Sequence, residues 1–228
     1  MPGGDDVPIP DPLIPLAYAA AITTRLKFST GVIILPQRHP LYLAKQLATL
    51  DVLSKGRLMV GIGSGWMKEE FESVDVGFNV RGARTDESIL AMRAIWSSDV
   101  ATYHGKHFHF HDVKSYPKPV QKGGIPIHVG GHSPAAARRA GRYGDGFFPT
   151  ITDAAKLSAI FAMVREEARK AGRNPDDIEF TAMAAPRAES LRALAAVGVN
   201  RVVFSPPSSD PAKLRAGLEA ITNEVGRV

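Results

Sequence analysis

Short apolar segments rich in β-branched residues recur along the chain and alternate with longer stretches in which apolar residues follow helical spacing. The apolar segments begin near residues 26, 57, 125, 145, 178 and 201. Most of them are continuously apolar rather than alternating with polar residues, a pattern typical of strands that are covered on both faces. The repeated strand–helix order therefore predicts an α/β protein with a parallel sheet.

Helices are predicted in the intervening stretches. The segment that starts at Pro40 places leucines at helical spacing and ends at Ser-Lys-Gly. Asp11 is a candidate N-cap for the first helix, with Pro12 at the first helical position. The predicted helices cover residues 12–24, 40–53, 84–97, 134–142, 153–171, 189–197 and 211–225.

One interval between predicted strands is longer than the others and holds an insertion at about residues 66–120. The insertion contains a helix and a hairpin-like segment, TYHGKHFHFHDV. Elsewhere strand–helix units continue without a reversal, which favours a (β/α) TIM-type barrel, one domain over residues 1–228, rather than a doubly wound sheet. Functional residues of such barrels lie at the carboxyl ends of the strands.

Charge and composition exclude several classes of partner. The net charge of +5 is dispersed and no block of five like charges occurs, so nucleic-acid binding is not indicated. No apolar run approaches about 18 residues, and the first residues, MPGGDDVPIPDP, are acidic and rich in turn formers, so we expect neither a signal peptide nor a membrane span. The absence of cysteine excludes disulfides and thiolate metal sites and suits a cytoplasmic protein.

The segment VGGHSPAAARRAG contains the most informative candidate site. Gly130 and Gly131 end a predicted strand and allow a ligand to approach the backbone closely. Ser133 can cap the next helix, with proline at the first helical position, which leaves free amides and a positive dipole end for an anion such as phosphate. Arg138 and Arg142, one turn apart, could extend this positive field. The alternative is an ordinary, well-capped turn between strand and helix.

The segment RLMVGIGSGW has only part of a dinucleotide-binding motif. That motif needs glycine at the third position of GxGxxG, where this chain has Trp66, and no suitable acid follows about 20 residues later. We interpret Gly61 and Gly63 instead as keeping the end of a barrel strand narrow, so that a flat ring can lie against the backbone. Trp66 is either an aromatic residue at the rim of a ligand site or a lid over the core.

Two further segments contain candidate chemistry. In STGVIILPQRHP, Gly31 lies inside a predicted buried strand and indicates a bulge or a close backbone approach, with Arg38 and His39 at the exit of the strand. In HGKHFHFHD, alternating histidines could bind zinc, but no carboxylate or cysteine partner is evident. We therefore expect no metal and interpret these residues as surface histidines: His104, His107, His109 and His111.

Three stretches have to be considered together: TGVIILPQRHPLYLAKQLATLDVLSKGRLMVGIGSGWMKEEFE, RGARTDESILAMRAIW and PKPVQKGGIPIHVGGHSPAAARRAGRYGDGFFP. They resemble the luciferase-like monooxygenase superfamily, and within it the F420-dependent oxidoreductases of actinobacterial type. The resemblance implies an oxidoreductase that transfers a hydride between coenzyme F420 and a small organic substrate. An FMN-dependent monooxygenase on the same fold and a non-catalytic flavin-binding or truncated remnant protein are the alternatives.

The resemblance also implies where the cofactor lies, and it predicts a non-proline cis peptide at Gly31–Val32, behind the ring. The residues expected at the ring are Thr30, Gly31, Val32, Gly61, Gly63, Ser64 and Gly65. Those expected at the phosphate of the cofactor's tail are Gly130, Gly131, His132 and Ser133. Gln37, His39, Trp66 and Phe148 are expected at the substrate pocket, and no residue is assigned as catalytic.

The beginning of the chain departs from the family. Family members begin with a strand, a helix and a second strand that ends in an Asp-His or similar pair, and these are not recognisable here, so that six strands remain where eight are expected. A barrel of eight parallel strands does not close with two strands missing. We expect a truncated sequence; a compact six-stranded relative and a partner that supplies the missing wall are the alternatives. The resemblance further implies a homodimer formed through the early helices.

Overall fold

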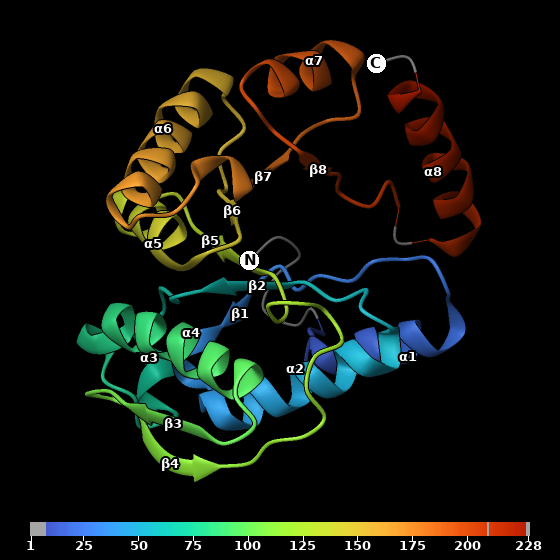
Figure 1. Ribbon diagram of the computed structural model, residues 1–228. Helices are drawn as coiled ribbons and strands as arrows, with labels where there is room; N and C mark the ends of the chain where they lie inside the picture. The colour runs from blue at the N-terminus through green and yellow to red at the C-terminus, as the bar shows by residue number, and fades with distance from the viewer. Residues whose placement is uncertain (1–7, 209, 227–228) are drawn as a thin grey trace. The chain divides into compact units, whose positions relative to one another are not determined.

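A computed structural model describes residues 8–208 and 210–226 (Figure 1). The chain forms two compact units, residues 1–127 and 128–228. The first residues, MPGGDDV, on which the expectation about a signal peptide partly depends, lie outside the described ranges. Among the helices that are described, none is both long enough and apolar enough to cross a membrane.

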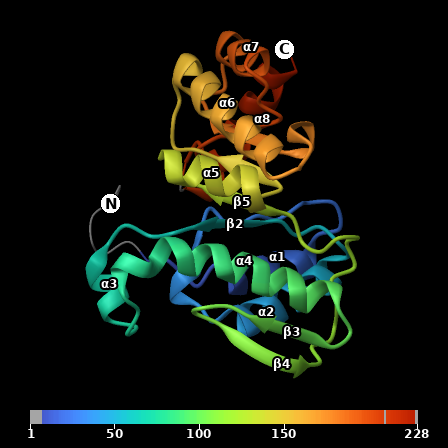
Figure 2. The same ribbon diagram turned by 60° about the vertical axis from the view of Figure 1, so that its left-hand side comes forward.

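The first unit combines a pair of parallel strands with helices and a hairpin. Strands β1 (Ile33–Ile34) and β2 (Val60–Gly63) pair with Ile33 opposite Ile62. The other elements are α1 (Leu13–Ile22), the 3-10 turn Leu35–Gln37, α2 (Pro40–Ser54), α3 (Lys68–Glu72), the 3-10 turn Phe78–Val80, α4 (Arg81–Ser97), β3 (Ala101–His104) and β4 (His109–Val113). In both ribbon views α2 and α4 lie side by side beneath β2, and the hairpin β3–β4 lies beyond them (Figures 1 and 2).

Helix α2 begins and ends where the sequence predicts. His39 caps it, because its Nδ1 accepts a hydrogen bond from the Leu41 amide at 3.3 Å, and Pro40 takes the first helical position. The helix ends at Lys55, which has a left-handed φ of 57°, and Gly56 follows with a φ of 77°. The predicted leucine spacing marks the face that packs in the core at Leu43, Leu47 and Leu50, whereas the last leucine of that spacing, Leu53, is 63% exposed.

The predicted hairpin of the insertion is confirmed, and one carboxylate on α4 holds its turn. Strands β3 and β4 are antiparallel, with His104 opposite His109. The carboxylate of Glu87 accepts hydrogen bonds from the amides of residues 106–108 at 3.0, 2.8 and 3.3 Å. These bonds satisfy backbone donors that the hairpin itself leaves unpaired, so they join the insertion to the helix.

The second unit is a run of strand–helix pairs around four parallel strands in the order β5, β6, β7, β8. Its elements are β5 (Ile127–Gly130), which begins at the boundary, α5 (Pro134–Tyr143), β6 (Gly146–Phe148), α6 (Ala154–Lys170), the 3-10 turn Pro175–Asp177, β7 (Glu179–Met183), α7 (Ala188–Ala196), β8 (Arg201–Val203) and α8 (Pro211–Val225). Helices α5 and α6 pack against each other. The ring of Phe161 on α6 stacks on Phe180 of β7 at 4.1 Å between centroids and meets Phe147 of β6 edge-on.

The six predicted strands are present, and the strand pairs within each unit, apart from the hairpin, are parallel. Two details of the prediction are wrong. The strand expected from residue 26 is reduced to an isolated bridge between Phe28 and Leu58 and the short β1, because the chain leaves the sheet in between. Helix α3 is not predicted, since five residues are too few to show a helical period.

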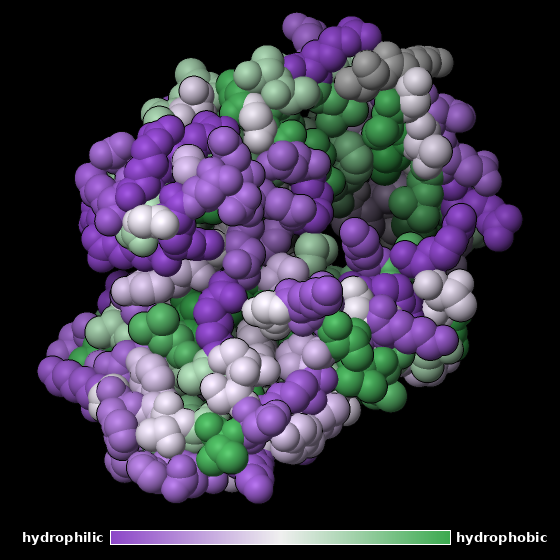
Figure 3. Space-filling model, viewed as in Figure 1, coloured by the Kyte–Doolittle hydropathy of each residue, from purple (hydrophilic) through white to green (hydrophobic). Residues whose placement is uncertain are grey.

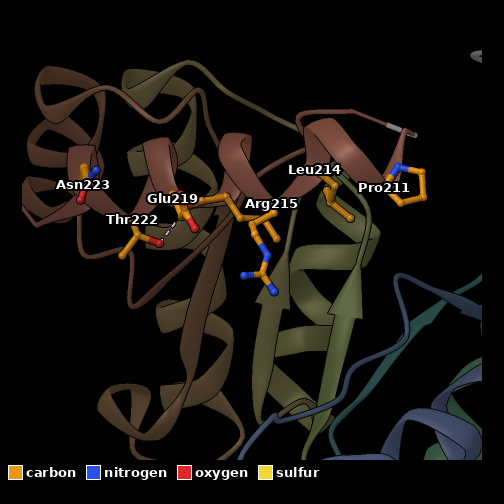
Figure 4. Close-up of a pocket in the computed structure, with 7 residues that line it drawn as sticks. Pro211, Leu214, Arg215, Glu219, Thr222 and Asn223 are labelled. Atoms are coloured by element: carbon orange, nitrogen blue, oxygen red, sulfur yellow. Dashed lines mark hydrogen bonds between the residues drawn. The ribbon is translucent and has the colours of Figure 1, made fainter.

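Helix α8 adds little to the core of the second unit. None of its residues is buried, and Leu218 and Val225 are 50% and 41% exposed. Apolar surface is visible between α7 and α8 in the space-filling view (Figure 3). The close-up shows that a hollow on this unit is lined by residues of α8 alone, from Pro211 to Asn223 (Figure 4).

Candidate functional site

In the first unit, the irregular segment before β1 and strand β2 bring the first group of predicted residues together. Thr30 is buried, and its hydroxyl makes two hydrogen bonds with Gly61: it donates to the carbonyl oxygen at 2.7 Å and accepts from the amide at 3.0 Å. The Gly31–Val32 peptide that follows is cis, which confirms the predicted irregular backbone. One side chain therefore joins the irregular segment to the neighbouring strand.

The glycines of β2 allow the chain to pack closely against this segment. A Cβ at Gly61 would collide with the carbonyl oxygen of Thr30, and a Cβ at Gly63 would lie 2.9 Å from Cγ2 of Val32. The interpretation that these glycines leave room for a flat ring is therefore wrong, because the chain itself fills that space. The apolar surface available at this point is Val32, which is 39% exposed. The assignment of these residues to a cofactor stays a prediction.

The turn after β2 contains the remaining residues that were expected near the ring. Gly65 has a φ of 74°, and a Cβ there would lie 2.6 Å from the ring of Phe71, so the turn requires glycine. The hydroxyl of Thr85 on α4 donates to Ser64 Oγ at 3.2 Å. Trp66 is 75% exposed, which rules out a lid over the core; its place at the rim of a ligand site stays a prediction.

Gln37 and His39, the polar candidates after β1, both have protein partners. Gln37 Nε2 donates to Glu70 at 3.4 Å, and the His39 ring packs edge-on against Phe108 at 5.5 Å between centroids. Burial, and then the positive charge of Arg84, lowers the pKa of His39. Its imidazole is therefore mostly neutral at pH 7, and because Nδ1 accepts the capping hydrogen bond, the proton lies on Nε2.

In the second unit, β5 leads into α5 through the predicted corner. Gly131 has a φ of 115°, and a Cβ there would lie 3.1 Å from the Ala136 Cβ. Ser133 is the N-cap of α5, since its Oγ accepts a hydrogen bond from the Ala136 amide at 3.2 Å, and Pro134 takes the first position. The predicted capping of this helix is confirmed.

The amides of this corner are not all available to a ligand. The Gly131 amide donates to the carbonyl oxygen of Phe148 at 3.3 Å, and the Ala136 amide is used by the cap. The Gly131 amide is therefore not among the free amides that the sequence predicts for an anion. Within the described part of the chain, the amides of His132, Ser133 and Ala135 have no acceptor. These three donors, at the positive end of a ten-residue helix, suit a phosphate oxygen.

Of the two arginines of α5 that were predicted to extend the positive field, Arg142 does not do so. Arg142 lies in the last turn of the helix, where its guanidinium donates to the Glu167 carboxylate at 3.0 and 3.2 Å. It therefore points its charge to the far end of α5 and extends no positive field to the corner. Arg138 is exposed, one turn after the first helical residues.

The loop after β6 connects this corner to a cavity that the sequence does not indicate. The His132 ring bonds to the Thr150 hydroxyl through Nδ1 at 2.8 Å, and Phe148 lies opposite Gly130 across the strands. Thr152, two residues farther along the loop, lines a cavity of about 600 Å³ at the carboxyl ends of β6, β7 and β8. Alanines and hydroxyl side chains make up most of its lining and come from four separate segments, so no local motif could have revealed it.

A buried histidine marks the opposite ends of these strands. The His128 ring lies over Gly146, where a Cβ would strike it, and its Nε2 is 3.6 Å from a Glu179 oxygen. The same oxygen accepts a hydrogen bond from Arg201 at 2.7 Å. Burial, followed by the charge of Arg201, lowers the pKa of His128, while Glu179 and Asp145 act in the other direction.

This depressed pKa predicts a pH-dependent stability. In the unfolded chain histidine titrates near pH 6.5. Because the folded protein holds His128 neutral, its contribution is fully present above about pH 6.5 and is lost as the pH falls through the lower folded-state pKa. We expect urea unfolding of His128→Gln to depend less on pH between about 7 and 5 than unfolding of the wild type. The matched control is the exposed His109→Gln; equal slopes for all three proteins would contradict the prediction.

The histidine-rich hairpin does not assemble a metal centre. His104 and His111 lie 6.0 Å apart between ring centroids, and His111 Nδ1 is 2.9 Å from the carboxylate of Asp112. Across the described ranges, no group of three or more histidine, aspartate or glutamate side chains could hold a metal ion. Exposure of His104, His109 and His111 is consistent with their interpretation as surface residues.

Comparisons with known proteins agree with the geometry of these strands. The family model described as luciferase-like monooxygenase matches residues 1–222. An uncharacterized protein of Mycobacterium tuberculosis is 34% identical over 200 residues, which cover 87% of this chain and 68% of the relative. An F420-dependent glucose-6-phosphate dehydrogenase of Nocardia farcinica is 35% identical over 174 residues, or 72% of this chain, and the match spans about half (51%) of that relative's length.

Solved structures share the fold. An F420-dependent secondary alcohol dehydrogenase in complex with an F420–acetone adduct has a TM-score of 0.79 at 20% identity, covering 92% of this chain and 82% of that one. The monooxygenase RslO1 from Streptomyces bottropensis has a TM-score of 0.67 at 29% identity, covering 95% and 73%. The predicted fold class, a (β/α) TIM-type α/β fold with six recognisable parallel strands, is confirmed.

Proposed function

Because the chain belongs to the luciferase-like monooxygenase family, we propose that it is an oxidoreductase that transfers a hydride between coenzyme F420 and a small organic substrate. The support is twofold. Curated relatives that are 34–35% identical are named as F420-dependent glucose-6-phosphate dehydrogenases. Solved structures of the same fold include an F420-dependent alcohol dehydrogenase and an F420-dependent reductase.

The observation that carries the proposal is the N-terminal corner of α5. The free amides of His132, Ser133 and Ala135 provide three donors where the helix dipole favours an anion. F420 and FMN both carry phosphate, so the donor set fits either cofactor. No carboxylate lies in the first turn of α5, so no negative side chain opposes the phosphate there.

In this proposal each group of residues has a binding role. When bound, F420 supplies the two-electron hydride chemistry. Within the second unit, the amides of the α5 corner hold the phosphate. Within the first unit, the exposed Val32 offers an apolar surface to a ring. The bonds between Thr30 and Gly61 hold the segment that presents Val32 in place.

FMN-dependent monooxygenase chemistry is the second candidate. A monooxygenase with the same fold is 29% identical to this chain, and the oxygenating constituent of a diketocamphane monooxygenase in complex with FMN is 25% identical. The α5 corner does not separate the two cofactors, because both offer it a phosphate. Discrimination between F420 and FMN therefore depends on contacts with the ring system and with the rest of the cofactor's tail.

Titration with cofactors and with their phosphate-free forms tests the proposal. We expect the full chain to bind F420 more tightly than FMN in fluorescence titrations. Removal of the phosphate should weaken binding about tenfold or more, because charge-assisted bonds to backbone amides are the strong ones. Riboflavin is the matched ligand for FMN, and the F420 chromophore without its tail is the matched ligand for F420.

Each result of this titration has one meaning. Tighter binding of FMN than of F420 would favour the monooxygenase alternative. Equal affinity for a cofactor with and without its phosphate would show that the α5 corner does not bind the phosphate. A separate turnover assay of the cofactor-bound chain tests the non-catalytic alternative, which the absence of any turnover would favour.

The proposed homodimer and the proposed cytoplasmic location are independent of the cofactor. Ile14, Tyr18 and Ile22 form a stripe on α1, and each is about 70% exposed (71%, 72% and 69%). This stripe supports an interface through the early helices, since exposed apolar patches of this kind mark interaction sites.

A further inference from the structure

The cavity of the second unit is built from neutral groups. It has a volume of about 600 Å³, within the range of small-molecule pockets. Its polar atoms include three hydroxyls, on Thr152, Ser190 and Ser205, and the other lining side chains are alanine, methionine, leucine and proline. No charged side chain lines it.

The helix ends beside the cavity make it still less suitable for an anion. Asp153 caps α6, and its carboxylate already accepts the Lys156 amide at 2.8 Å. In the first turn of α7 lies Glu189, and the Ala188 amide donates to the Glu224 carboxylate at 3.3 Å. Both helix dipoles therefore already face carboxylates, whereas the first turn of α5 contains none.

An anion finds no positive side chain in this lining, and the carboxylates of Asp153 and Glu189 at the neighbouring helix ends repel it. A ketone or an alcohol can instead exchange hydrogen bonds with the three hydroxyls, which both donate and accept. The alanines leave room for a compact apolar body. The cavity thus has the chemistry of a pocket for uncharged molecules.

We propose that this cavity binds the substrate and that the substrate is a neutral, mainly apolar alcohol or carbonyl compound rather than a sugar phosphate. The assignment of the ligand as substrate rests on the proposed function. Its place supports it: the cavity lies at the carboxyl ends of parallel strands, and the loop that contributes Thr152 also carries Thr150, the partner of His132 at the α5 corner. Because no charged side chain lines the cavity, we do not expect this chain to act on glucose 6-phosphate, the compound in the name of some of its relatives.

Two probes that share a cyclohexyl ring, one with a neutral hydroxyl and one with a charged carboxylate, test the proposal. Binding of cyclohexanol and of cyclohexanecarboxylate to the full chain, without cofactor, is measured by ligand-observed NMR. We expect cyclohexanol to bind, and neither cyclohexanecarboxylate nor glucose 6-phosphate to displace it. Displacement by either anion at similar concentration, or no detectable binding of cyclohexanol, would overturn the proposal.

Variants on α7 locate the bound probe. Ala193→Phe places a ring into the cavity and should weaken cyclohexanol binding by roughly fivefold or more, since small changes of volume in an apolar pocket have effects of this order. Ala196→Phe, on the same helix and exposed outside the cavity, is the matched control and should leave binding unchanged. Equal binding by both variants would refute the location.

A second substitution at the same position guards against misfolding. Ala193→Lys adds a long charged side chain to an exposed helix position, so the fold should tolerate it. It should invert the preference, so that cyclohexanecarboxylate binds better than cyclohexanol; an unchanged preference would contradict the proposal. If neither F420 nor FMN binds, but cyclohexanol binds and Ala193→Phe weakens its binding, the proposed function is refuted and the neutral pocket is supported. If a cofactor binds but cyclohexanol does not, the neutral pocket is refuted and the proposed function is unaffected.

Discussion

Ala135→Glu should weaken F420 binding by at least about tenfold and leave the folded structure intact. Ala135 is exposed in the first turn of α5, beside the free amides of the corner. A carboxylate there would lie close to the bound phosphate. Two like charges about 5 Å apart repel by about 3 kcal/mol at an effective dielectric constant of 20, and salt reduces this value. A loss of roughly 1.4 kcal/mol already corresponds to a tenfold change in Kd.

The same substitution should be neutral or slightly stabilising for the helix itself. A negative side chain in the first turn interacts favourably with the helix dipole, by about 0.3–1 kcal/mol. Binding and stability are thus expected to move in opposite directions, which a general loss of structure would not produce. F420 fluorescence titration and urea unfolding measure the two effects.

Ala135→Gln is the matched control, because it has nearly the same shape without the charge. Its F420 affinity should stay within about threefold of the wild type, a difference of less than 1 kcal/mol. If glutamate and glutamine weaken binding equally, the cause is steric and the corner does not hold a phosphate. If neither affects it, the phosphate lies elsewhere.

Much of the fold could be predicted because it depends on local patterns. The leucine spacing of α2, its Pro40 start and its Ser-Lys-Gly end are all signals within one turn of the residues they describe. The cap at Ser133 is equally local. The irregular backbone at Gly31 was expected because a glycine inside a buried apolar run needs a reason.

The errors lie where distant segments meet. The role of Gly61 depends on the Thr30 carbonyl, and the direction of Arg142 depends on Glu167 in the following helix. The use of the Gly131 amide depends on a carbonyl of the neighbouring strand. A sequence pattern within one segment contains no information on any of these contacts.

The neutral cavity could not be predicted from the sequence for the same reason, because distant segments form it. Its lining comes from the loop after β6 and the first residue of α6, residues 183–186, helix α7 and Ser205. Alanine and serine have no chemical signature in a sequence, whereas the residues predicted at the substrate pocket, Gln37, His39, Trp66 and Phe148, are conspicuous. The absence of charged side chains indicates what a site binds only after the residues that line the site are known.

Gly61→Ala should destabilise the protein by about 3 kcal/mol, at the upper end of the cost of an added methyl group in a packed region. The new Cβ would collide with the backbone carbonyl oxygen of Thr30, and a backbone atom moves less easily than the end of a side chain. Moving the strand away would also lengthen both hydrogen bonds between Thr30 and Gly61. Urea unfolding of the full chain, followed by circular dichroism, measures the effect.

A second glycine tests whether the effect comes from the contact between Gly61 and the Thr30 carbonyl oxygen or from any exchange of glycine for alanine. Gly226→Ala is the matched control: a Cβ there would meet only an ordinary contact, 3.4 Å from the Thr222 carbonyl oxygen, and its φ of −65° suits any residue. It should change the free energy of unfolding by less than about 0.5 kcal/mol or raise it slightly. Thr30→Val removes the hydroxyl without relieving the collision, so Gly61→Ala should remain destabilising in that background. A Gly61→Ala protein as stable as the control would show that β2 can move away from the irregular segment, and Val32 would then have no fixed support from which to contact a ring.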